Sequence, residues 1–385
     1  MVPSLAALTA PVRAAWMKPG SEPRIIRGIT YLLLAFGLAA VFSASTVQSL
    51  NTYGNAYSIF LKQLIFATLG VFLMLVADRL PLLTLRRLAL PAVGVVIALL
   101  LAVLAVGSTI NGAKNWIPLG PFTMQPSEFA KLAFILFAAE RVSSLSKRTR
   151  DPVRLGAPIL AVSVVVMVLV ALEKDMGNVM VFAGIMLAIL FVIGYPARAL
   201  GFMALGGLGV VIVALKFGSK YRLQRILNWL NPYADPQGFG WQWIHGIYAM
   251  AVGGFLGQGP GASKEKWGAL PEAHTDFILA VIGEEYGFVG TCITIGLLLT
   301  VLILLIRVAM RLGDDPFRQI IIVGVAAWLF MQCAFNIGAV VGILPIVGVT
   351  LPLVSYGGSS LLPLLVALGI VVRCLREPRE REVSG

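Results

Sequence analysis

The chain has 385 residues, of which 58% are hydrophobic and only 12% are charged, and its formal net charge is +12. An ordinary soluble domain is about a quarter charged, so the composition excludes soluble enzymes and, despite the basic balance, nucleic-acid-binding domains. The mean hydropathy is +0.90. The sequence therefore predicts an all-α polytopic membrane protein, because open strands leave backbone groups unpaired in lipid.

Ten apolar runs are long enough to be membrane helices, since a helix needs about 20 mostly apolar residues to cross the hydrocarbon core. They lie at 25–47, 57–77, 88–107, 125–141, 157–172, 178–195, 200–216, 277–306, 318–338 and 357–375. We therefore expect ten transmembrane helices in one domain over 25–375, with short tails at 1–24 and 376–385.

The distribution of lysine and arginine predicts the orientation of these helices. If the N-terminus is cytoplasmic, most of the 30 basic residues fall in tails and loops on that side, as cytoplasmic loops usually require. An even number of helices returns the C-terminus to the same side, so both termini are predicted to be cytoplasmic. The long connections 108–124, 217–276 and 339–356 then lie outside, and the largest of them joins helices 7 and 8.

The fourth run opens with an acidic and a basic residue three positions apart. Pro126 and Glu128 are typical of a helix start, and Lys131 can pair with Glu128. A purely structural salt bridge is one interpretation. A lysine inside an apolar run favours the other, in which Glu128 and Lys131 line a polar cavity and contribute to substrate binding.

Two arginines occur early in the large outer segment. Arg222 and Arg225 are three residues apart and share one helical face. They could bind phosphate, which the guanidinium group fits well. Anchoring at the membrane interface beside Tyr221 and Trp229 is an equally good interpretation.

A glycine-rich stretch, 253–261, precedes two lysines in the same segment. It lacks the spacing of a nucleotide-binding P-loop. Its backbone N–H groups could still approach a pyrophosphate, with Lys264 and Lys266 supplying positive charge. A flexible hinge is the alternative interpretation of the glycines.

Asp276 lies where the outer segment meets the eighth run, directly after His274 and Thr275. Capping of the following helix is its structural interpretation. A general base must be ionised yet able to accept a proton, and a carboxylate at the membrane boundary can be both. Asp276 is therefore the candidate catalytic residue, with His274 as a neighbouring substrate-binding residue.

Two further acids lie deeper in the same run. A charge at the centre of the membrane costs about 3 kcal/mol on insertion scales, so such groups normally face the interior of the bundle. Glu284 is about 80° from Asp276 around the helix, whereas Glu285 points away. We therefore expect Glu284 to face the cavity of Asp276 and to bind substrate.

Small residues interrupt the last two runs near the outer surface. The segments 338–352 and 355–360 are rich in glycine, proline and serine. Close helix packing by small residues accounts for such a composition. No catalytic role is expected for either segment.

Several of these motifs together resemble the SEDS family (shape, elongation, division and sporulation). The matching segments are 111–119, 125–133, 231–236, 271–278, 283–287 and 351–360. The resemblance covers about residues 25–375, and segments 263–266 and 271–276 are more similar to the division branch than to the elongation branch. One departure is Lys174, where the family more often has proline.

The resemblance implies a peptidoglycan glycosyltransferase of the bacterial inner membrane, acting at the division septum. Such an enzyme polymerises lipid II, a disaccharide-peptide on undecaprenyl pyrophosphate, into glycan strands. The essential aspartate of the family matches Asp276, which would deprotonate the acceptor sugar. The cations Arg222, Arg225, Lys264 and Lys266 would stabilise the departing pyrophosphate, and a divalent cation, Mg²⁺ or Mn²⁺, could bridge it. Expected partners are a class B penicillin-binding protein, which is a transpeptidase, and membrane proteins of the division complex.

Three other functions remain open from the sequence. A lipid II flippase would need a cavity that opens alternately to both faces, whereas the polar residues here cluster outside. A non-catalytic division scaffold would not need Asp276. An elongation polymerase would perform the same chemistry along the side wall of the cell.

Overall fold

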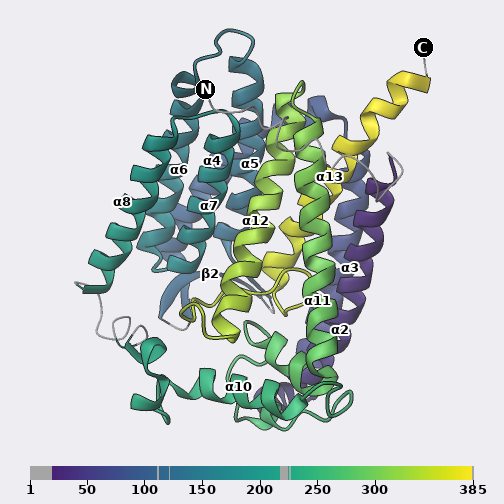
Figure 1. The fold of residues 1–385 in the computed structure, drawn as a ribbon, viewed down its shortest axis with the longest axis vertical. Coiled ribbons are helices and arrows are strands. Elements are labelled where there is room, and N and C mark those ends of the chain that lie inside the picture. The colour runs from purple at the N-terminus through teal and green to yellow at the C-terminus, as the bar shows by residue number, and fades with distance from the viewer. Residues whose placement is uncertain (1–19, 111, 121, 217–223, 225–226, 384–385) are drawn as a thin grey trace.

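The computed structural model describes residues 20–110, 112–120, 122–216, 224 and 227–383. Its long helices run side by side along one axis (Figure 1). Seven helical segments in this part of the chain are long and apolar enough to cross a membrane. They are α2 (Glu22–Tyr53), α3 (Ser58–Arg79), α4 (Leu82–Val106), α6 (Pro152–Leu172), α11 (Ile278–Arg311), α12 (Pro316–Val340) and residues Gly358–Arg376 of α13 (Gly358–Val383).

Three further helices complete the bundle. They are α5 (Pro126–Leu145), α7 (Met176–Val192) and α8 (Ala197–Lys216). Each of the ten predicted apolar runs overlaps one of the helices named so far. The prediction of an all-α polytopic membrane protein is confirmed. Helix α13 continues to Val383, so the segment predicted as a C-terminal tail is helical over most of its length.

A small antiparallel sheet follows α4, where the sequence analysis expected only a connection. Strands β1 (Ser108–Ile110), β2 (Ala113–Leu119) and β3 (Phe122–Met124) pair in the order β1-β2-β3. Gly112 and Gly120 lie at the two reversals with φ of 80° and 65°, a conformation that glycine adopts without strain. The strands are too short for their alternation to be recognised in the sequence.

A short helix, α10 (Trp241–Gly253), lies across one end of the bundle, near the sheet (Figure 1). Two 3-10 turns, η2 (Pro232–Ala234) and η3 (Glu265–Trp267), flank it in the chain. Helix α2 begins and α13 ends at the opposite end. The end that carries β2 and α10 is called the loop end below.

Helix α11 is broken near the loop end, which the sequence analysis did not predict. Gly287 has φ 66° and ψ −165°, far from helical values. The glycine-rich stretch supplies the missing hydrogen bonds: the backbone N–H of Phe288 donates to the oxygen of Gly254 at 2.9 Å, and that of Gly259 to the oxygen of Glu285 at 3.0 Å. A Cβ on Gly287 would come within 2.3 Å of the Gly257 nitrogen. The glycines thus allow two backbones to approach closely, because glycine has no Cβ to keep them apart.

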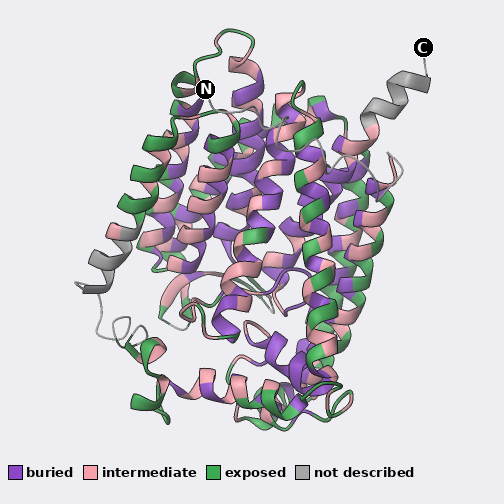
Figure 2. Cartoon of the chain, in the orientation of Figure 1, coloured by how far each residue is buried: buried purple, intermediate pink, exposed green. Residues whose placement is uncertain are grey.

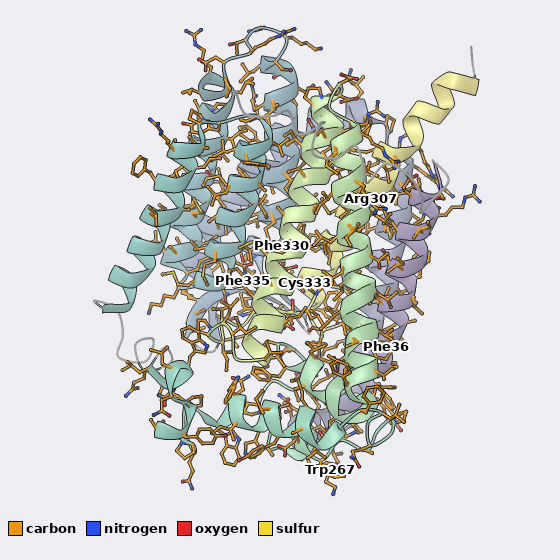
Figure 3. All side chains as sticks on the ribbon, viewed as in Figure 1. Phe36, Trp267, Arg307, Phe330, Cys333 and Phe335 are labelled. Carbon is orange, nitrogen blue, oxygen red and sulfur yellow. The ribbon has the colours of Figure 1, made fainter. Side chains whose placement is uncertain are left out.

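The core lies between the long helices, while their outer faces are exposed (Figure 2). Many of the exposed side chains are apolar. Trp328, Phe134, Phe182 and Phe317 are among the largest fully buried side chains. Across the α2–α11 contact, the Phe36 and Tyr286 rings meet edge to face at 5.2 Å, and Figure 3 labels Phe36 there. Exposed apolar faces around a packed interior are what lipid, as the solvent, requires.

Candidate active site

A cavity of about 1360 Å³ opens near the loop end of the bundle. Its walls come from α3, the sheet, the start of α5, the turn between α6 and α7, and the segments 272–276, 345–350 and 356–360. Three of the predicted site residues line it: Asp276, His274 and Glu128. Segments far apart in sequence therefore build one site around the proposed base.

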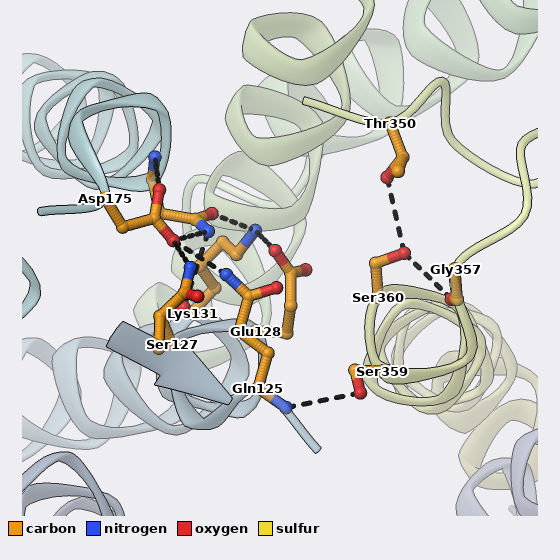
Figure 4. Close-up of polar contacts among 11 residues, drawn as sticks. Gln125, Ser127, Glu128, Lys131, Asp175, Thr350, Gly357, Ser359 and Ser360 are labelled. Atoms are coloured by element: carbon orange, nitrogen blue, oxygen red, sulfur yellow. Dashed lines mark hydrogen bonds and ion pairs between the residues drawn. The ribbon is translucent and has the colours of Figure 1, made fainter. Parts of the chain in front are cut away.

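Asp175 organises one wall of the cavity (Figure 4). Its Oδ2 accepts hydrogen bonds from Asn115 Nδ2 at 2.9 Å, Gln125 Nε2 at 2.7 Å and Asn178 Nδ2 at 2.9 Å. Its Oδ1 accepts from the Asn178 backbone at 3.1 Å and caps α7. One carboxylate thus fixes the sheet, α5 and α7 relative to one another.

Lys131 connects this wall to Glu128. The Lys131 ammonium donates to Glu128 Oε1 and to Asn178 Oδ1, each at 2.8 Å, and lies 5.1 Å from the centre of the Trp328 ring. Lys131 is fully buried and does not line the cavity, whereas Glu128 does. The second oxygen of Glu128, Oε2, is buried and lacks a hydrogen-bond partner within the described residues. Lys131 therefore holds Glu128 in place from behind.

Asp276 is half-buried at the edge of the cavity. The Thr275 hydroxyl lies 2.9 Å from Asp276 Oδ1 and 2.7 Å from Glu272 Oε2. Asn336 Nδ2 donates to the backbone oxygen of Asp276 at 2.8 Å. The cap residue of α11 is Phe277, so the interpretation of Asp276 as the helix cap is wrong. A side chain outside the helix can be directed by its loop toward the cavity.

His274 lies beside this aspartate and is almost completely buried. Burial lowers its pKa, and the negative charge of Glu272 opposes this effect. Its ring lies 5.3 Å from that of Tyr356, whose own pKa is raised to about 12 by burial and by Tyr53. Both rings are therefore uncharged near neutral pH and act as hydrogen-bonding groups.

The turn between α6 and α7 brings a cation to the cavity. Lys174 lines it and has φ 67°. Proline cannot adopt this value, because its ring fixes φ near −65°. The departure from the family pattern therefore changes both the charge and the backbone here.

Two lysines that were not among the predicted site residues also line the cavity. Besides Lys174, Lys62 lies on the wall, with its ammonium 3.3 Å from the Tyr53 hydroxyl and 4.5 Å from the centre of that ring. The presence of Lys174 where the family more often has proline was one sequence feature that could have indicated these lysines. Lys62, a lysine near the start of the second apolar run, was the other, since such charges usually face a polar space.

Neither of the two predicted phosphate-binding lysines lines this cavity. Arg222 and Arg225 lie outside the described residues. Lys264 is exposed and does not line the cavity. The Lys266 ammonium is buried, 2.9 Å from Glu285 Oε1, 2.8 Å from Ser43 Oγ and 2.7 Å from the Gly261 oxygen. Through these three contacts, Lys266 holds the loop that follows the glycine-rich stretch against α11 and α2.

Glu284 and Glu285 of α11 also bind this loop. Glu284 Oε2 accepts from Ser263 Oγ at 2.6 Å, and its Oε1 accepts from the Lys264 backbone at 2.7 Å. Glu284 does not line the cavity, contrary to expectation. Glu285, which was expected to point away, is equally buried and binds Lys266. Both acids find partners in the loop because the break at Gly287 brings the loop against α11.

Residues 23–380 match the model of a family described as "Cell cycle protein", which comprises FtsW, RodA and SpoVE. The chain belongs to this family. It is 39% identical over 346 residues to the probable peptidoglycan glycosyltransferase FtsW of Trichlorobacter lovleyi, covering 88% of this chain and 89% of that one. It is 37% identical over 354 residues to the stage V sporulation protein E of Bacillus subtilis, covering 91% and 96%.

Solved structures of the FtsW/RodA/SpoVE family have the same fold. A chain from a peptidoglycan synthase complex that coordinates polymerisation and crosslinking aligns with a TM-score of 0.74 at 31% identity, over 91% of this chain and 97% of that one. The rod-shape-determining protein RodA of Thermus thermophilus aligns with a TM-score of 0.67 at 27% identity, over 91% and 96%. The fold of the whole described bundle is thus that of the family.

The serine-rich segment before and within α13 lines the cavity in this family member, although the sequence analysis gave it no role. Ser359 Oγ donates to the Thr123 oxygen at 2.9 Å and accepts from the Gln125 backbone at 3.2 Å. Gly357 donates its backbone N–H to Gln63 Oε1 at 3.2 Å. Non-helical backbone at membrane depth is either buried in protein or lines a cavity, and here it lines the cavity.

No group of three or more histidine, cysteine, aspartate or glutamate side chains suited to a metal ion occurs in the part of the chain that the structure describes. Glu272 and Asp276 nevertheless both line the cavity and lie within reach of the same Thr275 hydroxyl. Mg²⁺ commonly binds one or two carboxylates and completes its shell with water and substrate phosphate. The donor set fits such a shared site.

Proposed function

We propose that this chain is a peptidoglycan glycosyltransferase that polymerises lipid II into glycan strands during septal cell-wall synthesis. The observation that carries the proposal is Asp276 on a 1360 Å³ cavity that also contains Lys62 and Lys174. Relatives at 33–39% identity bear the name peptidoglycan glycosyltransferase FtsW, which supports the same activity and the division role.

In the proposed reaction, Asp276 accepts the proton of the acceptor sugar's 4-hydroxyl as its oxygen attacks the anomeric carbon of the growing chain. The bond from that carbon to the pyrophosphate oxygen breaks, and the electron pair leaves with undecaprenyl pyrophosphate. A positioned general base of this kind contributes roughly 10²–10⁴-fold to rate. Thr275, next to Asp276 Oδ1, orients the carboxylate.

The leaving pyrophosphate is anionic, so the site needs positive charge where it departs. Lys62 and Lys174 supply that charge on the cavity wall in our proposal. Neutral His274 and Tyr356, also on the wall, offer hydrogen bonds to sugar groups. Mg²⁺ or Mn²⁺, if bound by Glu272 and Asp276, would add charge beside the pyrophosphate.

We further propose ten membrane crossings with both termini in the cytoplasm, which directs the loop end and its cavity to the outer face. Lipid II polymer is assembled on that face. A class B penicillin-binding protein and division-complex proteins would be the partners of this surface at the septum of the inner membrane. The similarity to a chain of a peptidoglycan synthase complex supports this partnership.

The decisive experiment is polymerisation of lipid II in detergent by the purified protein with its transpeptidase, comparing wild type with Asp276→Asn. Loss of the base should lower the initial rate by about 10²–10⁴-fold while the protein remains folded. Glu265→Gln is the matched control, because Glu265 is an acid of the same loop that does not line the cavity and should retain activity.

The same assay separates the rival functions. A flippase makes no polymer in detergent, so polymer from wild type excludes that rival. A scaffold would allow Asp276→Asn to support cell division, and retained polymer in this folded variant would remove Asp276 from the mechanism. Localisation to the side wall of the cell instead of midcell would favour an elongation polymerase.

A further inference from the structure

A second hollow, with a volume of about 380 Å³, lies beside α10 at the loop end. We call it the tryptophan groove. Its principal side chains are three tryptophans and three amides: Trp229, Trp241, Trp243, Asn228, Gln237 and Gln242. None of the described residues that line it is charged, although the chain as a whole is strongly basic.

This composition specifies a neutral, ring-shaped ligand with many hydrogen-bonding groups. Aromatic faces offer large apolar contact area, which the C–H faces of pyranose rings can cover. Side-chain amides both donate and accept hydrogen bonds, as sugar hydroxyl and acetamido groups require. A phosphate or an acidic peptide would instead need cations, which the described lining does not provide.

The tryptophan groove adjoins the cavity of Asp276. Gln242 and Ile346 line both spaces. Pro271 lines the groove, and the next residue, Glu272, lines the cavity. A chain growing at Asp276 could therefore pass into the groove without crossing the bundle.

The aromatic rings are held in place before any ligand binds. Trp229 Nε1 donates to the Gly342 oxygen at 2.9 Å, and Trp241 Nε1 donates to the Ala269 oxygen at 2.5 Å. The ring of Trp243 packs so closely on Gly342 that a Cβ there would lie 2.7 Å from it. Its Nε1 is buried and lacks a hydrogen-bond partner within the described residues. Rigid rings lower the entropic cost of binding.

We infer that the tryptophan groove binds the nascent glycan strand, as a β-1,4-linked N-acetylated sugar backbone, after it leaves the cavity of Asp276. This inference rests on the proposed function. Each added disaccharide would move the strand along the groove, and retention there would favour further additions over release. Product length, more than the first bond formed, should therefore depend on the groove.

Anchoring of the loop in the membrane interface is the competing explanation for these tryptophans. More strongly exposed apolar side chains lie nearby: Leu230 is 68% exposed, Phe255 66% and Leu256 75%. The three groove tryptophans are only partly exposed and line a concave space. The exposed leucines and phenylalanine are the better membrane anchors.

The first test is binding of a soluble oligomer of β-1,4-linked N-acetylglucosamine to the full-length protein, followed by ligand-observed NMR. Wild type and Asp276→Asn should both bind, because binding needs no catalysis. Trp243→Ala should weaken binding by about tenfold, which is the upper range for one aromatic contact. Gln237→Ala should also weaken it, and this exposed residue can be changed without disturbing the fold.

Trp267→Ala is the matched control. Trp267 is 71% exposed at the same end of the molecule and does not line the groove (Figure 3). In polymerisation assays, Trp243→Ala and Gln237→Ala should give shorter glycan strands, whereas Trp267→Ala should give strands of wild-type length.

These measurements distinguish glycan binding by the tryptophan groove from membrane anchoring by its tryptophans. Equal oligomer affinity and strand length in wild type, Gln237→Ala and a folded Trp243→Ala variant would overturn the inference. Oligomer binding without any polymerisation by wild type would reject the proposed function and leave the groove as a sugar-binding site.

Discussion

At the residue scale, the environment decides what each lysine of this chain can do. Lys131 and Lys266 are buried and bind carboxylates of Glu128 and Glu285, so their charge is already neutralised inside the fold. Lys174 is exposed on the cavity wall and is available to an incoming anion. The chemical type of a residue is therefore a weaker guide to its role than its partners are.

Glu173 shows the cost of a buried acid at this scale. Its side chain is fully buried, and neither carboxylate oxygen has a hydrogen-bond partner in the described part of the chain. Burial raises the pKa of Glu173 to about 8, and the negative charge of Asp175 adds to the effect. The folded protein therefore keeps a proton on Glu173 at pH values where the unfolded chain has released it.

This proton makes stability depend on pH. Because the folded pKa is raised from 4.5 to about 8, the folded state binds the extra proton between these values, and stability falls as pH rises through that window. Glu173→Gln removes the ionisable group. The variant's melting temperature relative to wild type should therefore be higher at pH 8.5 than at pH 5.

Thermal unfolding in detergent at the two pH values measures this difference. Any constant cost of burying the new amide cancels in the comparison. Asp314→Asn removes an exposed carboxylate from the turn between α11 and α12 and controls for the loss of one negative charge. A Glu173→Gln offset that is the same at both pH values would show that Glu173 does not titrate in this window.

At the element scale, the break in α11 and the glycine-rich stretch depend on each other. The stretch supplies hydrogen bonds to the broken helix, and the two acids before the break bind the loop that follows the stretch. This loop leads directly to Asp276. The contacts of Glu284 and Glu285 with the loop therefore position the segment that carries Asp276, without touching substrate.

The ion pair between Lys266 and Glu285 should be essential for holding the loop against α11. Lys266→Met leaves the buried Glu285 carboxylate without its cation, which should cost about 3–5 kcal/mol of unfolding free energy. The double variant Lys266→Met with Glu285→Leu removes both charges and should recover most of that loss, because an apolar pair needs no charge compensation.

Denaturation of the purified variants in detergent provides the measurement. Lys264→Met is the matched control, since Lys264 is the neighbouring exposed lysine, and its stability should stay near that of wild type. If the double variant were no more stable than Lys266→Met, the ion pair would not be the source of the loss.

At the scale of the whole molecule, the polar cavity opens at the loop end, and the interior between the helices is filled. The cavity and the tryptophan groove both lie at the loop end, and large side chains such as Trp328 and Phe317 occupy the core. Polymer chemistry on one membrane face needs this asymmetry. Transport would need an opening at each end.

The proposed topology predicts opposite faces for two loops. In a variant without Cys292, Cys333 and Cys374, an impermeant maleimide added to spheroplasts should label Lys264→Cys. It should label Asp314→Cys only after the membrane is permeabilised, because the turn between α11 and α12 lies at the other end of α11. Labelling of both positions in intact spheroplasts would contradict the topology.

The membrane class, the positions of the long helices and the choice of Asp276 as the candidate base could all be predicted from the amino-acid sequence. These features are local: hydropathy is a property of consecutive residues, and the motif around Asp276 is contiguous. The short sheet and the break at Gly287 were not predicted, because strand pairing and a helix break depend on partners elsewhere in the chain.

Which polar residues share the cavity depends on how the chain folds in space. Ser43, Lys266 and Glu285 meet although Ser43 lies far from the other two in sequence, and their contact takes Lys266 out of the predicted phosphate site. Lys62 reaches the cavity from the start of α3, and Lys174 reaches it from just after the end of α6. A charge becomes available or is neutralised according to its neighbours in space, and a linear pattern does not contain those neighbours.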